Sequence, residues 1–323
     1  MSKPSIAEYT VGWICALQEE FDASCRMLDD EFNGPESSEV NDNNTYVFGC
    51  IAGHNVVIGC LPGGQYGTNA AASVARDMVR SFPKLRFALM VGIGGGAPSR
   101  DSDIRLGDVV VSEPRGTLGG VVQVDLGKQL LDGTFERKGQ LDAPPQVLLG
   151  VLPHMRRHHN DPRKPDRIAK HTKLMDDMPD YRRPVEDRLY RADYPHKGGK
   201  NCEDCKADGL EDRPARSTIR EVTVHYGVIA SSNSVIKNPK TRDKYAQELN
   251  ILCFEMEAAG LANNFRCLVI RGICDYSDSH KNDEWHKYAA LTAAAYAREV
   301  LYMLKPEKVS GMPLWVEQLK EGK

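Results

Sequence analysis

Short apolar runs alternate with amphipathic segments along most of the chain. The apolar runs have strand length and many β-branched residues, which predicts buried strands. They cover 10–17, 85–96, 107–113, 119–127, 221–232 and 267–275, with two further strands joined by a turn over 45–61. Segments predicted as helices occupy 18–32, 67–82, 241–250, 253–265 and 282–304. Strands and helices that alternate in this way predict an α/β protein.

The pattern breaks down between residues 128 and 216. Eight of the 18 prolines lie between 144 and 195, among many charged residues, and one helix is predicted near 145–159. We interpret the rest as a long irregular insertion, with a solvated surface excursion as the plainer interpretation. Because no second core is evident, we predict a single α/β domain over 1–323, with 305–323 as a C-terminal tail.

Composition narrows the class of partner. Lys and Arg total 42 against 45 Asp and Glu, a net charge of −3, which gives no reason to expect nucleic acid or an anionic membrane. No apolar stretch has the length of a membrane span, and the first residues lack the apolar core of a signal peptide. Most of the nine cysteines lie in apolar runs, as buried reduced thiols do. We therefore expect a cytoplasmic protein with a small-molecule ligand.

Three acidic residues lie at or near the ends of predicted strands. Glu20 follows the first strand, Glu257 lies among apolar residues beside Glu255, and Asp275 ends the last strand. Glu20 has a structural alternative as a helix-dipole acid, and Glu257 has one as a member of a salt bridge. Ligands of α/β proteins bind at the carboxyl ends of the strands. Three acids at that edge favour a site.

The glycine-rich run "VGIGGG" is weaker evidence. It lacks the spacing of a dinucleotide-binding turn, and the chain has no GxxxxGK[ST] motif, so neither a dinucleotide nor a nucleotide-hydrolase site is supported. Gly94 and Gly95 would allow the backbone to approach a flat ligand closely, although a tight turn alone also explains them.

The motifs "GWICALQEEFDA", "VGIGGGAP", "LGDVVVSE", "VIASSNSVI", "FEMEAAGLA" and "VIRGICDYSDS" together resemble the nucleoside phosphorylase/nucleosidase superfamily. Their order is similar to that of 5′-methylthioadenosine/S-adenosylhomocysteine nucleosidases. The insertion and the final helix resemble a fungal subfamily found in NLR-type immune receptors. The resemblance implies an αβα sandwich with a central mixed, twisted sheet, no cofactor, and a homo-oligomeric assembly.

The resemblance also implies cleavage of a purine nucleoside at its N-glycosidic bond. Asp275 would protonate the leaving purine at N7. Glu257 would grip the ribose hydroxyls, with Met256 against the sugar and Glu255 beside it. Glu20 matches the position of the general base that activates water.

Hydrolysis is favoured over phosphorolysis. Phosphorylases of the superfamily hold phosphate with arginines and a hydroxyl, whereas this chain has acids after the first strand and Ile93 in the glycine turn. Two acids there repel a phosphate dianion by about 1 kcal/mol or more per close pair. Arg76, Arg80 and Arg271 leave a phosphorylase open as an alternative. A nucleoside-sensing domain without turnover is the second alternative.

Substrate recognition is predicted in less detail. The resemblance places Tyr66 near the 5′ position of the ribose, and a phenol suits a hydroxyl there better than a thioether, which favours adenosine, inosine or guanosine. Val235 stands where relatives stack an aromatic residue on the purine, so Tyr194 or His196 is a candidate to cover the base. Asn233 replaces an aspartate of many relatives.

A second cluster has metal-like spacing. Cys202 and Cys205 form a CxxC pair with His196 nearby, a weak candidate for zinc because a structural site needs four ligands. A redox pair and plain loop thiols are the alternatives. We expect Cys274 to be a core thiol and His286 to be a surface or packing residue.

Overall fold

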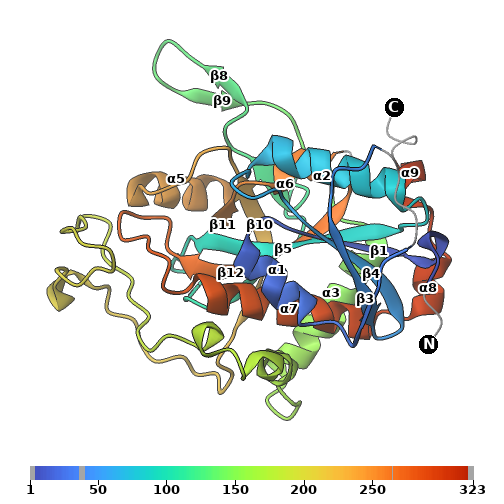
Figure 1. Cartoon of the computed structure of the whole chain (residues 1–323). Helices are drawn as coiled ribbons and strands as arrows, with labels where there is room; N and C mark the ends of the chain where they lie inside the picture. The colour runs from blue at the N-terminus through green and yellow to red at the C-terminus, as the bar shows by residue number, and fades with distance from the viewer. Residues whose placement is uncertain (1–3, 36–40, 264, 319–323) are drawn as a thin grey trace.

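The computed structural model describes residues 4–35, 41–263 and 265–318, and its centre is a twisted mixed sheet with helices on both faces (Figure 1). The strands are β1 (Val11–Cys15), β2 (Asp30–Phe32), β3 (Tyr46–Ile51), β4 (His54–Cys60), β5 (Phe87–Gly96), β6 (Val109–Ser112), β7 (Val121–Gln123), β8 (Gly127–Gln129), β9 (Phe135–Arg137), β10 (Val224–Ser231), β11 (Ile251–Glu255) and β12 (Cys267–Asp275). The predicted αβα architecture is confirmed.

The helices occupy most of the segments predicted for them. They are α1 (Gln18–Cys25), α2 (Thr68–Ser81), α3 (Gln146–Asn160), α4 (Arg167–Thr172), α5 (Pro239–Leu249), α6 (Ala258–Leu261), α7 (His286–Met303), α8 (Pro306–Ser310) and α9 (Trp315–Gln318). None of the helices in the described part of the chain has the length and apolarity that crossing a bilayer requires.

The sheet order brings the ends of distant strands together. The order is β11-β10-β6-β12-β5-β1-β4-β3-β2, and β11 also pairs with the end of β5, which closes part of the sheet on itself. Strand β5 lies between β1 and β12 and runs parallel to both. The carboxyl ends of these three central strands therefore meet at one edge of the sheet.

Two predicted elements were wrong in part. The helix predicted over 18–32 ends at Cys25, and Asp30–Phe32 instead pairs with β3 as an edge strand. The helix predicted over 253–265 is a strand as far as Glu255, which pairs with β10 and β5. In both cases sheet pairing overrides a helical pattern, because a short apolar segment fits either structure.

Helix α7 explains the Ala-rich end of the sequence. It packs on β5 and β12, while α1, α3 and α4 cover its outer side, so nearly all of its residues are buried. Small side chains allow this close packing on two sides. The predicted tail is docked as far as it is described: Trp315 is buried, and its indole Nε1 donates to the carbonyl of Arg266.

The stretch 128–216 contains α3, α4 and the short hairpin strand β9, followed by a long irregular path along one side of the molecule (Figure 1). Backbone groups of this path bond to side chains of the loop between β12 and α7. The Trp285 indole donates to the carbonyl of Glu186 at 3.2 Å, and the backbone N–H of His196 donates to Ser279 Oγ at 3.2 Å. The insertion therefore adjoins the loop that follows Asp275.

Candidate active site

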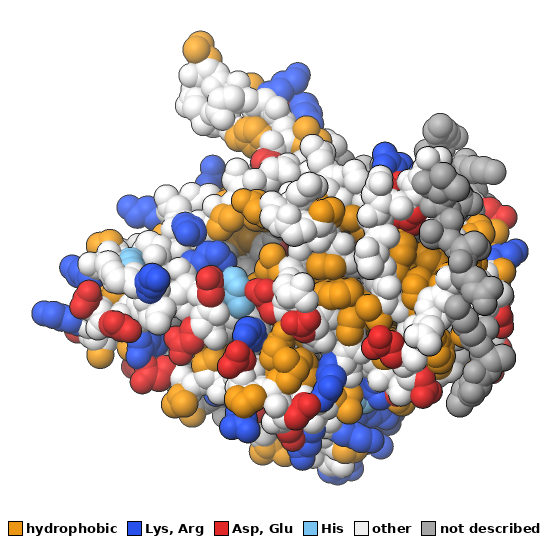
Figure 2. All heavy atoms as spheres, viewed as in Figure 1, with side chains coloured by type: hydrophobic (Ala, Val, Ile, Leu, Met, Phe, Trp, Pro, Cys, Tyr) orange, Lys and Arg blue, Asp and Glu red, His pale blue; other side chains and the backbone are white. Residues whose placement is uncertain are grey.

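A cavity of about 220 Å³ lies where β1, β5, β11 and β12 end. The face in Figure 2 is hollowed near its centre, with hydrophobic and basic side chains at the rim. Nine of the predicted site residues line the cavity: Glu20, Tyr66, Gly94, Gly95, Val235, Glu255, Met256, Glu257 and Asp275. The fold thus brings together acids from three distant segments of the chain.

Glu20 is held rigidly by backbone groups. It lies in the first turn of α1, is buried, and folds back so that Oε2 accepts from the N–H groups of Ala16 (2.7 Å) and Leu17 (3.0 Å). Its Oε1 accepts from the N–H of Ile93 at 2.7 Å. Burial raises the pKa of Glu20, although the charge of Arg271 and these three donors oppose the rise.

Arg271 is the buried cation of the site. Its side chain on β12 is fully inaccessible, and its Nη2 donates to Glu255 and, at 3.3 Å, to Oε2 of Glu257. Its Nε and Nη1 have no hydrogen-bond partner among the described residues. Nη1 and Glu20 Oε1 both lie beside Gly92, because a Cβ added to Gly92 would lie 2.4 Å from each of them.

Glu255 and Glu257 have different environments although they are two residues apart. The carboxylate of Glu255 is well supplied with hydrogen-bond donors: it binds Arg271 and accepts from the N–H groups of Glu257 (3.1 Å) and Ala258 (2.9 Å). Among the described residues, Glu257 makes two longer contacts: it accepts from Arg271 and from the N–H of Gly67, each at 3.3 Å. Burial raises the pKa of Glu257 to about 7, with Arg271 opposing and neighbouring carboxylates adding to the rise.

Asp275 forms an ion pair that the sequence did not indicate. Its Oδ2 binds the Lys281 ammonium and accepts from the Cys274 thiol, while Oδ1 accepts from the N–H of Ser277 at 2.7 Å. Burial by itself would raise the pKa of Asp275, but Lys281 and these donors outweigh it, so the pKa is lowered. Asp275 is therefore ionised and shares a hydrogen bond with an ammonium group.

The glycines serve the protein's own packing. A Cβ at Gly95 would lie 2.6 Å from Asp275 Oδ1 and 2.2 Å from Ser277 Oγ, and one at Gly94 would lie 2.9 Å from the carbonyl oxygen of Phe254. Contacts this short exclude any side chain. These glycines therefore allow β5 to meet β11 and the end of β12.

The remaining predicted residues are divided between the rim and the insertion. Tyr66 and Val235 line the mouth and are 62% and 48% exposed. Asn233 does not line the cavity; its Oδ1 accepts from Thr68 Oγ1 at 2.9 Å at the start of α2. Tyr194 and His196 do not line it either, so neither covers a base in this structure.

Sequence reasoning missed part of the cavity wall. Lys281, Ser277 and His286 line it. His286, expected to be a surface or packing residue, has its Nδ1 3.2 Å from Glu19 Oε1. The only signal for Lys281 was its place in the polar loop after Asp275, and polar loops are common.

The described residues contain three clusters that could hold a metal ion. The first, with Cys274, Asp275 and His286, already contains the Lys281 ammonium, which repels a cation. In the second, Glu299 binds His159 at 2.9 Å and lies 3.6 Å from Arg167, which accounts for it as an ion-pair network. The third, with His196, Cys202 and Cys205, lies apart from the cavity.

Together these features define an α/β protein with an acid-lined cavity at the carboxyl ends of its sheet. The family model described as the phosphorylase superfamily matches residues 10–304, and the chain belongs to that family.

A relative described as a nucleotide-binding leucine-rich repeat (NLR)-like protein of Hyaloscypha variabilis is 46% identical over 309 residues. This match covers 94% of the chain but 30% of the relative. The chain therefore spans about a third of the length of that protein. The expected resemblance to NLR-associated proteins is confirmed.

Solved structures share the fold at low identity. Futalosine hydrolase of Helicobacter pylori matches with a TM-score of 0.58 and 15% identity, over 93% of this chain and all of that chain. The 5′-methylthioadenosine/S-adenosylhomocysteine nucleosidase of the same organism gives 0.57 and 16%, over 92% and 100%. The nucleosidase of S. pneumoniae gives 0.56 and 18%, over 92% and 100%.

Proposed function

We propose that the protein hydrolyses the N-glycosidic bond of purine nucleosides (adenosine, inosine or guanosine) to the free base and ribose. The observation that carries the proposal is the convergence of Glu20, Glu257 and Asp275 on one cavity. The names of the solved neighbours, which are hydrolases and nucleosidases, support it. The cytoplasmic location and the homo-oligomeric assembly remain predictions.

Glu257 is the residue best suited to the ribose. Its carboxylate is buried, makes only two long contacts and keeps acceptor capacity toward the cavity. The ribose becomes oxocarbenium-like as the bond breaks, so a carboxylate on its hydroxyls stabilises the developing positive charge. Glu255 acts indirectly in this scheme, by holding Arg271 and the backbone of Glu257 in place.

Glu20 would position the nucleophile. Oε1 of Glu20 accepts one backbone N–H and retains a lone pair, and the unpartnered Nη1 of the fully buried Arg271 lies close by, beside the same Gly92. A water molecule bound there attacks the anomeric carbon and gives its proton to Glu20. The raised pKa of Glu20 suits a base that must hold this proton.

Asp275 and Lys281 would supply the proton that the departing purine needs. When the bond between the anomeric carbon and N9 breaks, its electron pair moves onto the purine, and protonation at N7 neutralises that charge. The Lys281 ammonium gives a proton to Asp275 through their hydrogen bond, and Asp275 passes that proton to N7. The proton that Glu20 takes from water is released to solvent, and Lys281 regains one from solvent, so nucleoside and water give base and ribose.

The structure also supports water rather than phosphate as the nucleophile. Arg76 and Arg80 both lie beside Asp77 on α2, at 3.0 and 3.3 Å, and neither lines the cavity. Arg271 is engaged by two carboxylates. A phosphate dianion would therefore meet more negative than positive charge at this site.

The test incubates the 323-residue protein with each nucleoside, with and without phosphate, and separates the products by chromatography. We expect free base and ribose at equal rates in both buffers. Because Tyr66 is 62% exposed at the 5′ side, the panel includes adenosine 5′-monophosphate as a 5′-substituted substrate. Strict dependence on phosphate, with ribose 1-phosphate as the product, would establish the phosphorylase instead.

The Glu20→Gln and Glu19→Gln variants form a matched pair. Glu20→Gln removes the base, and we expect kcat to fall by about 10²–10⁴. Glu19→Gln makes the same change one residue away, on a side chain that binds His286 outside the proposed reaction path, and should retain most activity. If the wild-type protein binds nucleosides in calorimetry but releases no base in either buffer, the non-catalytic sensing domain is correct.

A further inference from the structure

The insertion gathers three metal-ligating side chains away from the cavity. The ligand atoms of His196, Cys202 and Cys205 lie within 4.8 Å of one another. Tetrahedral zinc, with bonds of about 2.0–2.3 Å, holds its ligand atoms roughly 3.3–3.8 Å apart, so the three need to approach by only about an ångström. No element of the proposed hydrolysis uses these residues.

The turn that carries the two cysteines has an unusual backbone. The N–H of Cys205 donates to the carbonyl of Cys202 at 3.0 Å, which closes the CxxC segment into a tight turn. Cys202 has φ of +59°, in the left-handed region that non-glycine residues seldom adopt. Such a conformation costs roughly 1–3 kcal/mol and persists where other interactions hold it. A metal ion bound by both thiolates is an interaction of that kind.

His196 is oriented for ligation. Its Nδ1 accepts from the backbone N–H of Gly198 at 3.3 Å, and its own backbone N–H donates to Ser279 Oγ at 3.2 Å. Because Nδ1 accepts this hydrogen bond it carries a lone pair, and in the neutral imidazole the proton is then on Nε2. Nδ1 of His196 is therefore the nitrogen that a metal would take, in place of the long contact with Gly198.

His280 is the candidate for a fourth ligand, and its ring nitrogens lie outside the cluster of His196, Cys202 and Cys205, so its side chain must turn toward that cluster. Its side chain is buried and stacks on Tyr190 with a centroid distance of 3.9 Å, and neither ring nitrogen has a hydrogen-bond partner among the described residues. Nδ1 lies 3.6 Å from Asp278 Oδ1, which leaves Nε2 for a ligand. The rings of His280 and His196 are 5.5 Å apart between centroids. A buried imidazole with two unused nitrogens is costly unless it binds something.

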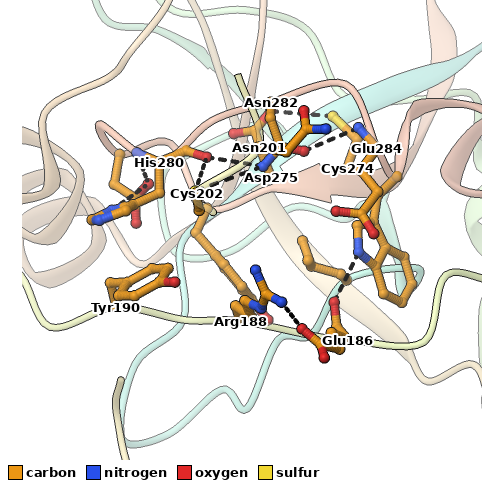
Figure 3. Close-up of a pocket in the computed structure, with 14 residues that line it drawn as sticks. Glu186, Arg188, Tyr190, Asn201, Cys202, Cys274, Asp275, His280, Asn282 and Glu284 are labelled. Atoms are coloured by element: carbon orange, nitrogen blue, oxygen red, sulfur yellow. Dashed lines mark hydrogen bonds and ion pairs between the residues drawn. The ribbon is translucent and has the colours of Figure 1, made fainter. Parts of the chain in front are cut away.

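Cys202 already joins the two segments. Its thiol donates to the backbone carbonyl oxygen of His280 at 3.5 Å, a contact marked in Figure 3 near Tyr190. Asp275 borders the same small pocket, of about 30 Å³. An ion here would therefore link the insertion to the loop between β12 and α7.

We propose that His196, Cys202 and Cys205 bind a structural zinc ion, and that the His280 side chain turns in as the fourth ligand and so fastens the insertion to the loop after β12. Two thiolates and two imidazoles in a tetrahedral arrangement favour zinc over the hard cations, which prefer oxygen ligands. Because all four positions are filled by protein, the ion has a structural role and activates no water. This proposal does not depend on the proposed hydrolysis.

The first measurement is the metal content of the tag-free 323-residue protein by plasma mass spectrometry, after dialysis against zinc and then against buffer. We expect about one zinc per chain. Replacement by Co²⁺ should give the visible bands of tetrahedral cobalt and a sulfur-to-cobalt charge-transfer band. Less than about a tenth of a zinc per chain, or octahedral cobalt without the sulfur band, would overturn the proposal.

Paired variants locate the site. Cys202→Ser with Cys205→Ser should lower the zinc content at least about tenfold, whereas Cys25→Ser with Cys50→Ser, at two partly buried thiols elsewhere, should leave it unchanged. Retention of zinc in the first pair overturns the assignment. Retention in His280→Asn removes His280 from the ligand set.

Two further measurements use the wild-type protein and so do not depend on whether a variant folds. A strong chelator should release the zinc, make two further thiols reactive, and increase proteolytic cleavage within 128–216. A Cys202–Cys205 disulfide, shown by two thiols that react only after reduction, would replace the zinc site with a redox pair.

Discussion

Asp275 and Lys281 form a buried ion pair across the turn that ends β12, and the partner of the predicted acid is thus a lysine only six residues away. Burial lowers the pKa of Lys281, whereas the neighbouring Cys274 and Asp275 raise it. The net result is a raised pKa. The pair therefore carries one proton to high pH. A carboxylate with a lowered pKa can still act as an acid when its neighbour returns the proton.

The Asp275→Asn variant should lose turnover without losing the fold. The amide oxygen of the introduced side chain can still accept from the Ser277 N–H, but the amide cannot relay a proton to the purine. We expect kcat to fall by about 10²–10⁴, with circular dichroism unchanged. Activity within a few-fold of wild type would remove Asp275 from the reaction.

The Lys281→Met variant should change the pH profile as well as the rate. Without the ammonium, burial dominates and raises the pKa of Asp275, so Asp275 can hold the proton alone at low pH. Asp275 alone loses that proton at a lower pH than the wild-type pair does. The decrease of kcat on the high-pH side of the profile should therefore occur at a lower pH. Lys308→Met, on the surface of α8, should leave the profile unchanged. An unchanged high-pH limb in Lys281→Met would contradict the shared proton.

The Glu257→Gln variant should abolish most activity and increase stability at neutral pH. Burial raises the pKa of Glu257 from the ordinary 4.5 to about 7, so the folded state binds more protons than the unfolded state between these values. Its contribution to stability is fully present below pH 4.5 and is lost as the pH rises to about 7. Glutamine does not titrate, so the free energy of unfolding of the variant does not fall with pH at this position.

Thermal unfolding of wild type and Glu257→Gln from about pH 4 to about pH 8 checks this linkage. The difference in the free energy of unfolding should move in favour of the variant by of order 1–3 kcal/mol as the pH rises through that window. Glu248→Gln, at an exposed position of α5, should show no such trend. A constant difference across the range would mean that Glu257 titrates normally.

The Gly92→Ala variant should disturb the proposed water site directly. The new Cβ would lie 2.4 Å from Arg271 Nη1 and from Glu20 Oε1, so one or both side chains must move. Overpacking of this kind costs about 1–3 kcal/mol. We expect a lower melting temperature and a lower kcat with little change in KM. Gly150→Ala, where no atom lies within 4 Å of the added Cβ, is the matched control.

The sequence by itself determined the fold class, most strands, and the acids at the cavity. Apolar runs ending in Glu20 and Asp275 indicated the ligand-binding edge, because parallel strands place their carboxyl ends together. It also marked the CxxC segment of the insertion, because cysteine spacing is readable locally.

Only the tertiary structure decided how those acids are partnered. In the sequence, Arg271 is one residue of a predicted strand and nothing around it indicates a special role. In the structure it is the buried cation next to Glu20, Glu255 and Glu257. Lys281 and His280 read as loop residues, and the closure of β11 onto β5 is absent from any local pattern. Electrostatic partners and strand pairing depend on distances between residues far apart in the chain. Hydrophobic periodicity records only which face of a segment is buried, so these partners appear once the chain has folded.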